Sequence, residues 1–269
     1  KIRYAFVHSQ GITDVKIPYI GITDFTSAEQ ARNMLAVFSA NRNGVTDRKL
    51  MVGVMMSYKT LNGLPTKWSS AFPSNDKVSG IFLRRSILFN TLHYADYDGI
   101  NVIENLLRAT SLAGSNLHAL QLDMIWPEPD TIKEYRYHYP QFKVIIQVNK
   151  VALEQIENNP KLLTKKLRSY GCSIDYALLD KSMGRGLGMD EKVLRPFVQE
   201  LAEHMPELGM TVAGGLGPNT IHLVENLARD YPQISIDAQG QLRPSGNALD
   251  PIDWDMAAEY LVKAIELLT

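Results

Sequence analysis

The sequence YALLDKSMGRGLG places Asp180 at the end of a short apolar run, with three glycines just after it. A carboxyl group at the C-terminal end of a buried strand is where a barrel of parallel strands holds its catalytic groups. Asp123 has the same setting at the end of the run LHALQLD. Two carboxyl groups with different pKa values can serve as the acid and the base of one proton transfer. We therefore predict that Asp180 and Asp123 are catalytic.

Two other carboxyl groups are alternatives for the second catalytic group, and a lysine permits a different class of reaction. Asp24 follows the first predicted strand and Asp237 lies in the eighth, near the same mouth. Asp24 also fits a turn or a helix start, which is the interpretation that we favour. Lys181 could form a Schiff base with a sugar carbonyl. Neighbouring residues of a strand point to opposite faces, so an inward Asp180 implies an outward Lys181.

A second glycine-rich segment, GGLG, follows the seventh predicted strand. Its residues Gly214, Gly215 and Gly217 lack the Cβ atoms that would block an approaching anion, so main-chain N–H groups can face it. Barrels of this class commonly hold phosphate in the loops after strands seven and eight. The end of the eighth strand adds Gln239 and Gly240. We therefore predict that these five residues bind a phosphate group.

Two basic residues and one tryptophan are candidates at the rim of the site. Lys67 lies in residues 57–78, a long segment rich in Gly, Pro, Ser and Lys, and a loop of that length is usually functional or mobile. We predict that this segment is a lid. Arg185, among the glycines after the sixth strand, and Lys67 would clamp an anion if their loops closed. Trp126 is expected either to wall an aromatic substrate group or to cover the barrel rim.

Eight short apolar runs alternate with helical patterns and would position these residues, which is typical of strand-helix units on a parallel sheet. A capping box of Thr26 and Glu29 is expected to begin the first helix, and Asp253 the last. Pro196 is expected to kink or restart the helix that it interrupts. The eight units are expected to begin with strands in residues 15–23, 49–56, 80–90, 117–125, 142–149, 176–180, 210–219 and 234–240.

The chain has 269 residues, which suits one (β/α)8 barrel of about 250 residues. Hydrophobic residues make up 45% and charged residues 21%, so a large core can form. No linker or composition shift divides the chain. We therefore predict an α/β fold, a single (β/α)8 TIM-barrel domain that covers residues 1–269.

The composition also argues against several classes of protein. The net charge is −1 and no dense basic block is present, so a nucleic-acid partner is not expected. No apolar run reaches about 18 residues and no leader is visible, so a membrane partner is not expected. With Cys172 as the single cysteine, a cytoplasmic protein is expected. The six histidines lack metal-binding spacing and no dinucleotide motif occurs, so neither a metal nor another cofactor is expected.

Several of these segments resemble a known family, phosphoribosylanthranilate isomerase. The stretch AGGLGPNT, residues 213–220, resembles its GGL-x-P-x-N phosphate loop, and ALLD, residues 177–180, resembles its strand six. The stretch ALQLD, residues 119–123, is similar to its V-Q-L-H strand four, and YIGIT, residues 19–23, lies where its K-I-C-G-I-T strand one would fall. The similarity extends over residues 16–268 and implies a TIM barrel of the ribulose-phosphate-binding type.

The resemblance also implies a chemistry, with two departures. In that family a strand-one cysteine is the base and a strand-six aspartate the acid of an Amadori rearrangement of an aminoaldose to an aminoketose. Asp180 matches the acid, but Ile20 stands at the cysteine position and cannot take a proton. Cys172 precedes the sixth strand, at the wrong end of the barrel. In the eighth strand the sequence DAQG replaces a serine-serine-glycine phosphate contact, and an inward Asp237 would repel phosphate.

The expected function is therefore an aldose-ketose isomerase of the Amadori type that acts on a small phosphorylated sugar derivative, with Asp180 as acid or base. The missing cysteine favours a second class, a barrel that binds a metabolite or a protein partner without catalysis. A lyase or aldolase that uses Lys181 is a third alternative. Both a monomer and an oligomer are compatible with the sequence.

Overall fold

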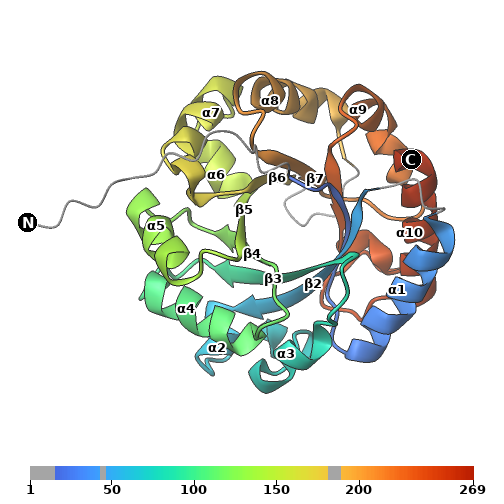
Figure 1. Cartoon of the computed structure of the whole chain (residues 1–269), viewed down its shortest axis with the longest axis horizontal. Coiled ribbons are helices and arrows are strands. Elements are labelled where there is room, and N and C mark those ends of the chain that lie inside the picture. Colours follow the sequence, from blue (N-terminus) through green and yellow to red (C-terminus); the bar gives the residue numbers. More distant parts are fainter. Residues whose placement is uncertain (1–15, 43–46, 181–188) are drawn as a thin grey trace, which may run out of the picture.

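The computed structural model describes residues 16–42, 47–180 and 189–269, and within them eight parallel strands close into a barrel in sequence order (Figure 1). Each strand pairs with the next, and β8 pairs with β1. The predicted (β/α)8 TIM-barrel fold is confirmed. The strands are β1 (Tyr19–Thr23), β2 (Lys49–Ser57), β3 (Leu88–Asp96), β4 (Ala119–Met124), β5 (Lys143–Val148), β6 (Tyr176–Asp180), β7 (Gly209–Ala213) and β8 (Ser235–Ala238).

The helices surround the barrel, which Figure 1 shows end-on with the strands at the centre. In the described residues they are α1 (Ala28–Asn41), α2 (Tyr58–Leu61), α3 (Val78–Ile81), α4 (Val102–Ala113), α5 (Pro129–His138), α6 (Lys150–Gln155), α7 (Pro160–Arg168), α8 (Glu191–His204), α9 (Glu225–Asp230) and α10 (Trp254–Leu268). Short 3-10 helices occupy Lys67–Ser70, Asn75–Lys77, Gly171–Ser173, Ile221–Val224 and Gly240–Leu242. None of these helices is long and apolar enough to cross a membrane.

Alternation along the strands separates two apolar cores. One set of side chains packs between the strands and the helices, as Ile20 and Ile22 of β1 do. The alternate set fills the barrel interior; it consists of Tyr19, Met51, Phe89, Ala119, Ile145, Tyr176, Leu178 and Ala213. Inward positions nearer the C-terminal strand ends are polar in several strands. The barrel thus has an apolar floor and a polar mouth.

Several local predictions are corrected by the structure. The third strand is Leu88–Asp96 and not a strand in residues 80–90, because the parallel register pairs Leu50 of β2 with Leu88. The capping box lies one residue later than predicted. The Ser27 side chain accepts from the Gln30 N–H and the Gln30 side chain accepts from the Ser27 N–H, which satisfies donors at both positions.

The predicted restart of the helix at Pro196 does not occur, because α8 continues through the proline; a kink there stays a prediction. The N-cap of α8 is Asp190, whose side chain accepts from the Lys192 N–H at 3.0 Å. The predicted Asp253 cap of α10 is confirmed by bonds from Asp255 and Met256. Residues 57–78 contain α2, two short 3-10 helices and the segments that join them, and a lid role for them stays a prediction.

Candidate active site

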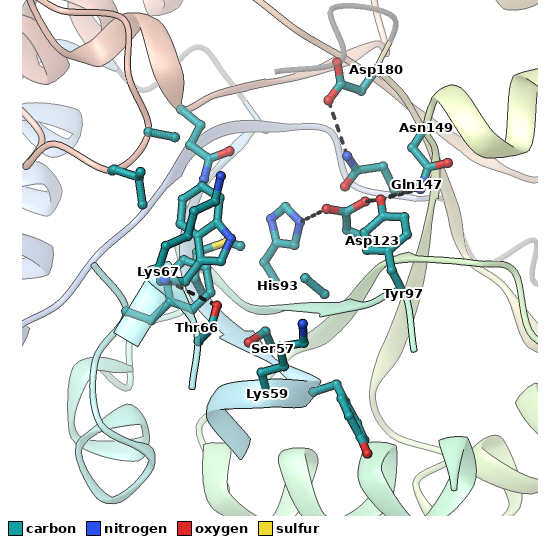
Figure 2. Close-up of a pocket in the computed structure, with 18 of the residues that line it drawn as sticks. Ser57, Lys59, Thr66, Lys67, His93, Tyr97, Asp123, Gln147, Asn149 and Asp180 are labelled. Atoms are coloured by element: carbon teal, nitrogen blue, oxygen red, sulfur yellow. Dashed lines mark hydrogen bonds and ion pairs between the residues drawn. The ribbon is translucent and has the colours of Figure 1, made fainter. Parts of the chain in front are cut away.

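The C-terminal ends of the strands surround a cavity of about 870 Å³, which we call the main cavity. Its volume is within the usual range of small-molecule sites, about 300–1,000 Å³. Strand alternation turns one polar side chain after another into it (Figure 2). The polar residues at its base are His93, Asp123, Gln147, Asn149, Asp180 and Gln239. Both predicted catalytic aspartates, Asp123 and Asp180, therefore line one cavity.

His93 of β3 and Asp123 of β4 form an ion pair at the base of the main cavity. The His93 Nε2 atom lies 3.8 Å from the Asp123 Oδ2 atom, and Figure 2 shows the two side chains facing each other. Burial alone would lower the pKa of His93, but the facing Asp123 carboxylate, with the charges of Asp237 and Asp24, raises it overall. The imidazole thus keeps its proton to a higher pH than an isolated histidine does.

Asp123 is held ionised by its neighbours. The Asn149 Nδ2 atom lies 3.2 Å from the Asp123 Oδ1 atom, and the Tyr97 hydroxyl donates a hydrogen bond to the same oxygen. Burial tends to raise the pKa of Asp123, but His93 and the hydrogen bonds from Tyr97 and Asn149 lower it below its usual value. Asp123 is therefore suited to stabilise a proton on His93.

Asp237 has the opposite electrostatic character. It is buried in β8, and the Thr23 hydroxyl lies 3.1 Å from both of its carboxylate oxygens. Burial, together with the negative charges of Asp180 and Asp24, raises the pKa of Asp237 to about 7. His93 and the Thr23 hydrogen bond act in the opposite direction but do not outweigh it. Asp237 therefore carries a proton for part of the time near neutral pH, whereas Asp123 does not.

Asp237→Asn should change how stability depends on pH. The folded protein holds the Asp237 proton to about pH 7, whereas an unfolded aspartate releases it near pH 4. The stability associated with this proton is therefore complete below about pH 4 and is lost as the pH rises through 7. Relative to wild type, the free energy of unfolding of the variant should gain about 2 kcal/mol between about pH 5 and pH 7. Chemical denaturation at the two pH values measures this difference, and an equal difference at both would contradict a raised pKa.

Asp24 belongs to a buried anchor in the segment between β1 and α1 and does not start the helix, which is capped by Ser27. Its φ of 95° lies in the left-handed region, which few residues other than glycine adopt. The Arg243 guanidinium donates to the Asp24 Oδ2 atom and also to the carbonyls of Gln239 and Asp250. Gln239 donates to both Asp24 oxygens at 3.0 and 3.1 Å. This cluster ties the end of β1 to the segment after β8.

The glycines predicted to bind phosphate differ in their surroundings. Gly214 and Gly215 have φ values of 101° and 73° and border a small recess of about 90 Å³ beside the main cavity, together with Gln239 and Gly240. Gly217 does not border the recess, and a Cβ there would lie 2.6 Å from the Gln241 carbonyl oxygen. Close packing thus explains Gly217. Asp180 and Asp237 also border the recess.

Of the residues predicted at the rim of the site, only some line the main cavity. Lys67 lines the main cavity, with its ammonium group 5.2 Å from the ring centre of Trp68. Trp126 does not line it, because its ring is buried and its Nε1 donates to the Gln147 carbonyl oxygen at 2.8 Å. Trp68 provides the aromatic wall instead. Arg185 and Lys181 lie outside the described residues.

The structure shows where Ile20 and Cys172 lie relative to the mouth of the barrel. Ile20, which the family resemblance places at the cysteine position, packs in the outer core between strands and helices, so its side chain faces away from the barrel interior. Thr23 is the β1 residue that points toward Asp237. Cys172 is exposed in the short 3-10 helix that precedes β6. Within the described ranges, no group of three or more His, Cys, Asp or Glu side chains is arranged to hold a metal ion.

The sequence interpretation missed several residues of the site. His93 was noted only for lacking a metal-binding spacing, and Gln121, Gln147, Asn149 and Tyr97 were not singled out. Residues two apart in a strand point to the same face, and this provides a signal for Gln121, Gln147 and Asn149: Gln121 precedes Asp123 by two residues, and Gln147 precedes Asn149 by two. For His93 that signal requires the correct position of β3.

No protein-family model matches the chain, and no curated protein sequence matches it. Solved structures do. N-(5'-phosphoribosyl)anthranilate isomerase from Pyrococcus furiosus is similar with a TM-score of 0.57 and 16% identity, over 92% of this chain and 98% of that one. Ribulose-1,5-bisphosphate carboxylase/oxygenase from Pyrococcus horikoshii OT3 gives 0.54 and 14%, over 95% of this chain and 59% of that one.

A Rubisco-like protein from Rhodopseudomonas palustris gives a TM-score of 0.53 and 10% identity, over 94% of this chain and 65% of that one. The present chain thus spans less than two thirds of both Rubisco-type chains, in contrast to the isomerase, which it matches almost end to end. At these identities the likeness concerns the fold. The chain is a (β/α)8 barrel similar to these proteins, and its chemistry must be inferred from its own cavity.

Proposed function

We propose that the protein is an acid-base isomerase that converts a small phosphorylated aldose derivative into the corresponding ketose derivative. The observation that carries the proposal is the set of ionisable groups around one cavity. Asp123 is held ionised, while Asp237 and His93 hold protons to higher pH than usual. Pairs of groups whose environments separate their pKa values are typical of acid-base catalysis.

The geometry supports a division of roles. Asp180 is half-buried at the end of β6, where it can reach a bound molecule, and it is the acid that the family resemblance implies. It would donate a proton to the ring oxygen of the aldose derivative and so open the ring. The His93–Asp123 pair would take the proton from the neighbouring carbon, with the Asp123 charge stabilising the imidazolium. Positioned proton transfers of this kind contribute about 10²–10⁴-fold to a rate.

The phosphate group would occupy the recess beside Gly214 and Gly215. The main-chain N–H groups of such a turn suit an anion, and Gln239 and Gly240 complete the border. An ionised Asp237 would oppose phosphate there. Its pKa of about 7 reduces this repulsion, because part of the population is neutral near pH 7. Phosphate binding is therefore expected to weaken as the pH rises above 7.

Gly215→Asp should weaken phosphate binding strongly. The new carboxylate would occupy the border of the recess and repel the anion, at a position whose φ of 73° already disfavours a side chain. A thermal-shift titration with inorganic phosphate and with a reduced analogue of an aminoketose phosphate measures the effect. In wild type, ligand at 100 times its dissociation constant adds about 2.7 kcal/mol of stability. In the variant, affinity should fall at least about tenfold, or 1.4 kcal/mol.

Gly171→Asp is the matched control, because Gly171 also has a positive φ of 55° but lies before β6, at the opposite end of the strands. It should bind phosphate as wild type does. If no phosphate ester shifts the wild-type melting temperature, the sugar-phosphate proposal is wrong. A phosphate-dependent shift without turnover of any aldose phosphate derivative would instead indicate a barrel that binds such a molecule without isomerising it.

A further inference from the structure

Two buried glutamines connect His93 to Asp180 across four neighbouring strands. The Gln121 Nε2 atom lies 3.3 Å from the His93 Nδ1 atom and donates to the Gln147 Oε1 atom at 3.1 Å. The Gln147 Nε2 atom then donates to the Asp180 Oδ2 atom at 3.3 Å, as Figure 2 shows. Both glutamines are buried, with exposed fractions of 1% and 6%. We call Gln121 and Gln147 the amide ladder.

The direction of the amide ladder fixes the protons at both of its ends. An amide nitrogen only donates, so the His93 Nδ1 atom must accept and the proton of the neutral ring must be on Nε2, which faces Asp123. At the other end, Gln147 donates to a carboxylate oxygen, which favours ionised Asp180. The direction of donation reverses only if the side-chain amide group of Gln121 or Gln147 rotates so that its oxygen and nitrogen exchange places.

Reversal of one amide requires reversal of the other. If the His93 Nδ1 atom gains a proton, Gln121 must turn its Oε1 atom toward it. This oxygen is buried and has no hydrogen-bond partner among the residues that the structure describes. Gln147 must then turn as well, to donate to Gln121, and its Oε1 atom would meet the Asp180 Oδ2 atom. Two oxygens in contact are tolerated only if Asp180 is protonated.

We propose that Gln121 and Gln147 are positioning residues that hold resting His93 as the Nε2–H tautomer and make protonation of His93 and of Asp180 mutually dependent. The catalytic consequence of this ladder depends on the proposed isomerase function, but its existence does not. In that function, the resting arrangement is not the reactive one: reversal of the ladder moves the His93 proton to Nδ1, which frees Nε2 as the base, and leaves Asp180 protonated as the acid.

Charge alone predicts a different behaviour. The carboxylates that face the His93 region come from four strand ends, and every negative charge among them raises the pKa of the imidazole. Removing the Asp180 charge would by this effect lower the pKa of His93 or leave it unchanged. Removing the constraint that the amide ladder places on Gln121 should instead raise the pKa of His93, because Gln121 can then accept a hydrogen bond from the protonated ring. The groups concerned are Asp24, Asp123, Asp180 and Asp237, with Tyr97 beside Asp123 and with Lys59, Lys67 and Lys150 on the wall of the main cavity.

Histidine-selective ¹⁵N NMR without any substrate tests the proposal, with His93→Gln identifying the His93 signals. Wild type should show the Nε2–H tautomer above the His93 pKa. In Gln147→Met, which cuts the ladder, and in Asp180→Asn, which can pair with either amide direction, the His93 pKa should rise by about one pH unit. The exclusive Nε2–H tautomer should be lost in Gln147→Met.

Met55→Leu is the control, because Met55 lines the main cavity and belongs to the apolar wall; the His93 tautomer and pKa should not change. An Nδ1–H tautomer in wild type would overturn the proposal. So would an unchanged or lowered His93 pKa in both ladder variants. If Gln147→Met does not fold, Asp180→Asn at the half-buried rim decides alone. Because no turnover is measured, failure here and failure of the isomerase function are distinguishable.

Discussion

Asp180→Asn is expected to lower kcat by about 10²–10⁴-fold on any aldose phosphate derivative that the wild type isomerises. The substitution preserves the shape of the side chain, but an amide cannot deliver a proton to the ring oxygen of the substrate. Asp180 faces the main cavity at the C-terminal end of β6. An effect on kcat larger than the effect on KM would indicate that the lost interaction acts in the transition state and not in ground-state binding.

The measurement is a steady-state assay over a range of pH, with Asp190→Asn as the matched control. Asp190 undergoes the same exchange, but it caps α8, where asparagine is as good a cap as aspartate. The control should retain wild-type kcat. Asp123→Asn should also lose activity, because His93 would lose the charge that stabilises its protonated form. Wild-type turnover by Asp180→Asn would exclude Asp180 as the acid and would direct attention to Asp237.

The sequence was sufficient for the fold and for the placement of Asp180 and Asp123. Both follow apolar runs in which alternate residues must be buried on opposite faces of a strand, so the direction of the last side chain is nearly determined. The same reasoning places Gln147 of β5 and Asn149, which directly follows the strand, on one side of the sheet. These are local properties, which a single sequence carries directly.

His93 was missed because the third strand was expected about eight residues too early. The segment before β3 is apolar but forms α3 and a turn, and only pairing with β2 shows that the strand begins at Leu88. Of the two roles predicted for Trp126, walling the cavity is excluded, because the ring packs edge-on against Tyr170 and its N–H donates to the Gln147 carbonyl oxygen. The other role, covering the barrel rim, stays a prediction. Such choices depend on partners distant in the sequence.

The pairing of Asp24 with Arg243 is the most distant of these contacts, since 219 positions separate the two residues. Both side chains are nearly inaccessible, with exposed fractions of 8% and 3% for the two residues. Arg243 also satisfies two main-chain carbonyls of the segment after β8, which continues to Ala248 and Leu249 on the wall of the main cavity. The anchor therefore connects the stability of the barrel with the shape of the site.

Arg243→Met should lower the free energy of unfolding by about 3–5 kcal/mol, because it leaves the Asp24 carboxylate buried without its cation. Adding Asp24→Asn should recover part of that loss, since asparagine removes the uncompensated charge and tolerates the positive φ of this position. Chemical denaturation of the two single variants and the double variant gives the interaction free energy of the pair.

Arg229→Met is the matched control, because the Arg229 side chain is 68% exposed and its loss should change stability by no more than about 0.5 kcal/mol. Additive effects of the two anchor substitutions would show that Asp24 and Arg243 do not stabilise each other. The variants also connect stability to function. If the anchor shapes the cavity, the double variant should fold yet bind phosphate esters more weakly than wild type, because Gln239, which borders the recess, would lose its ionised partner at Asp24.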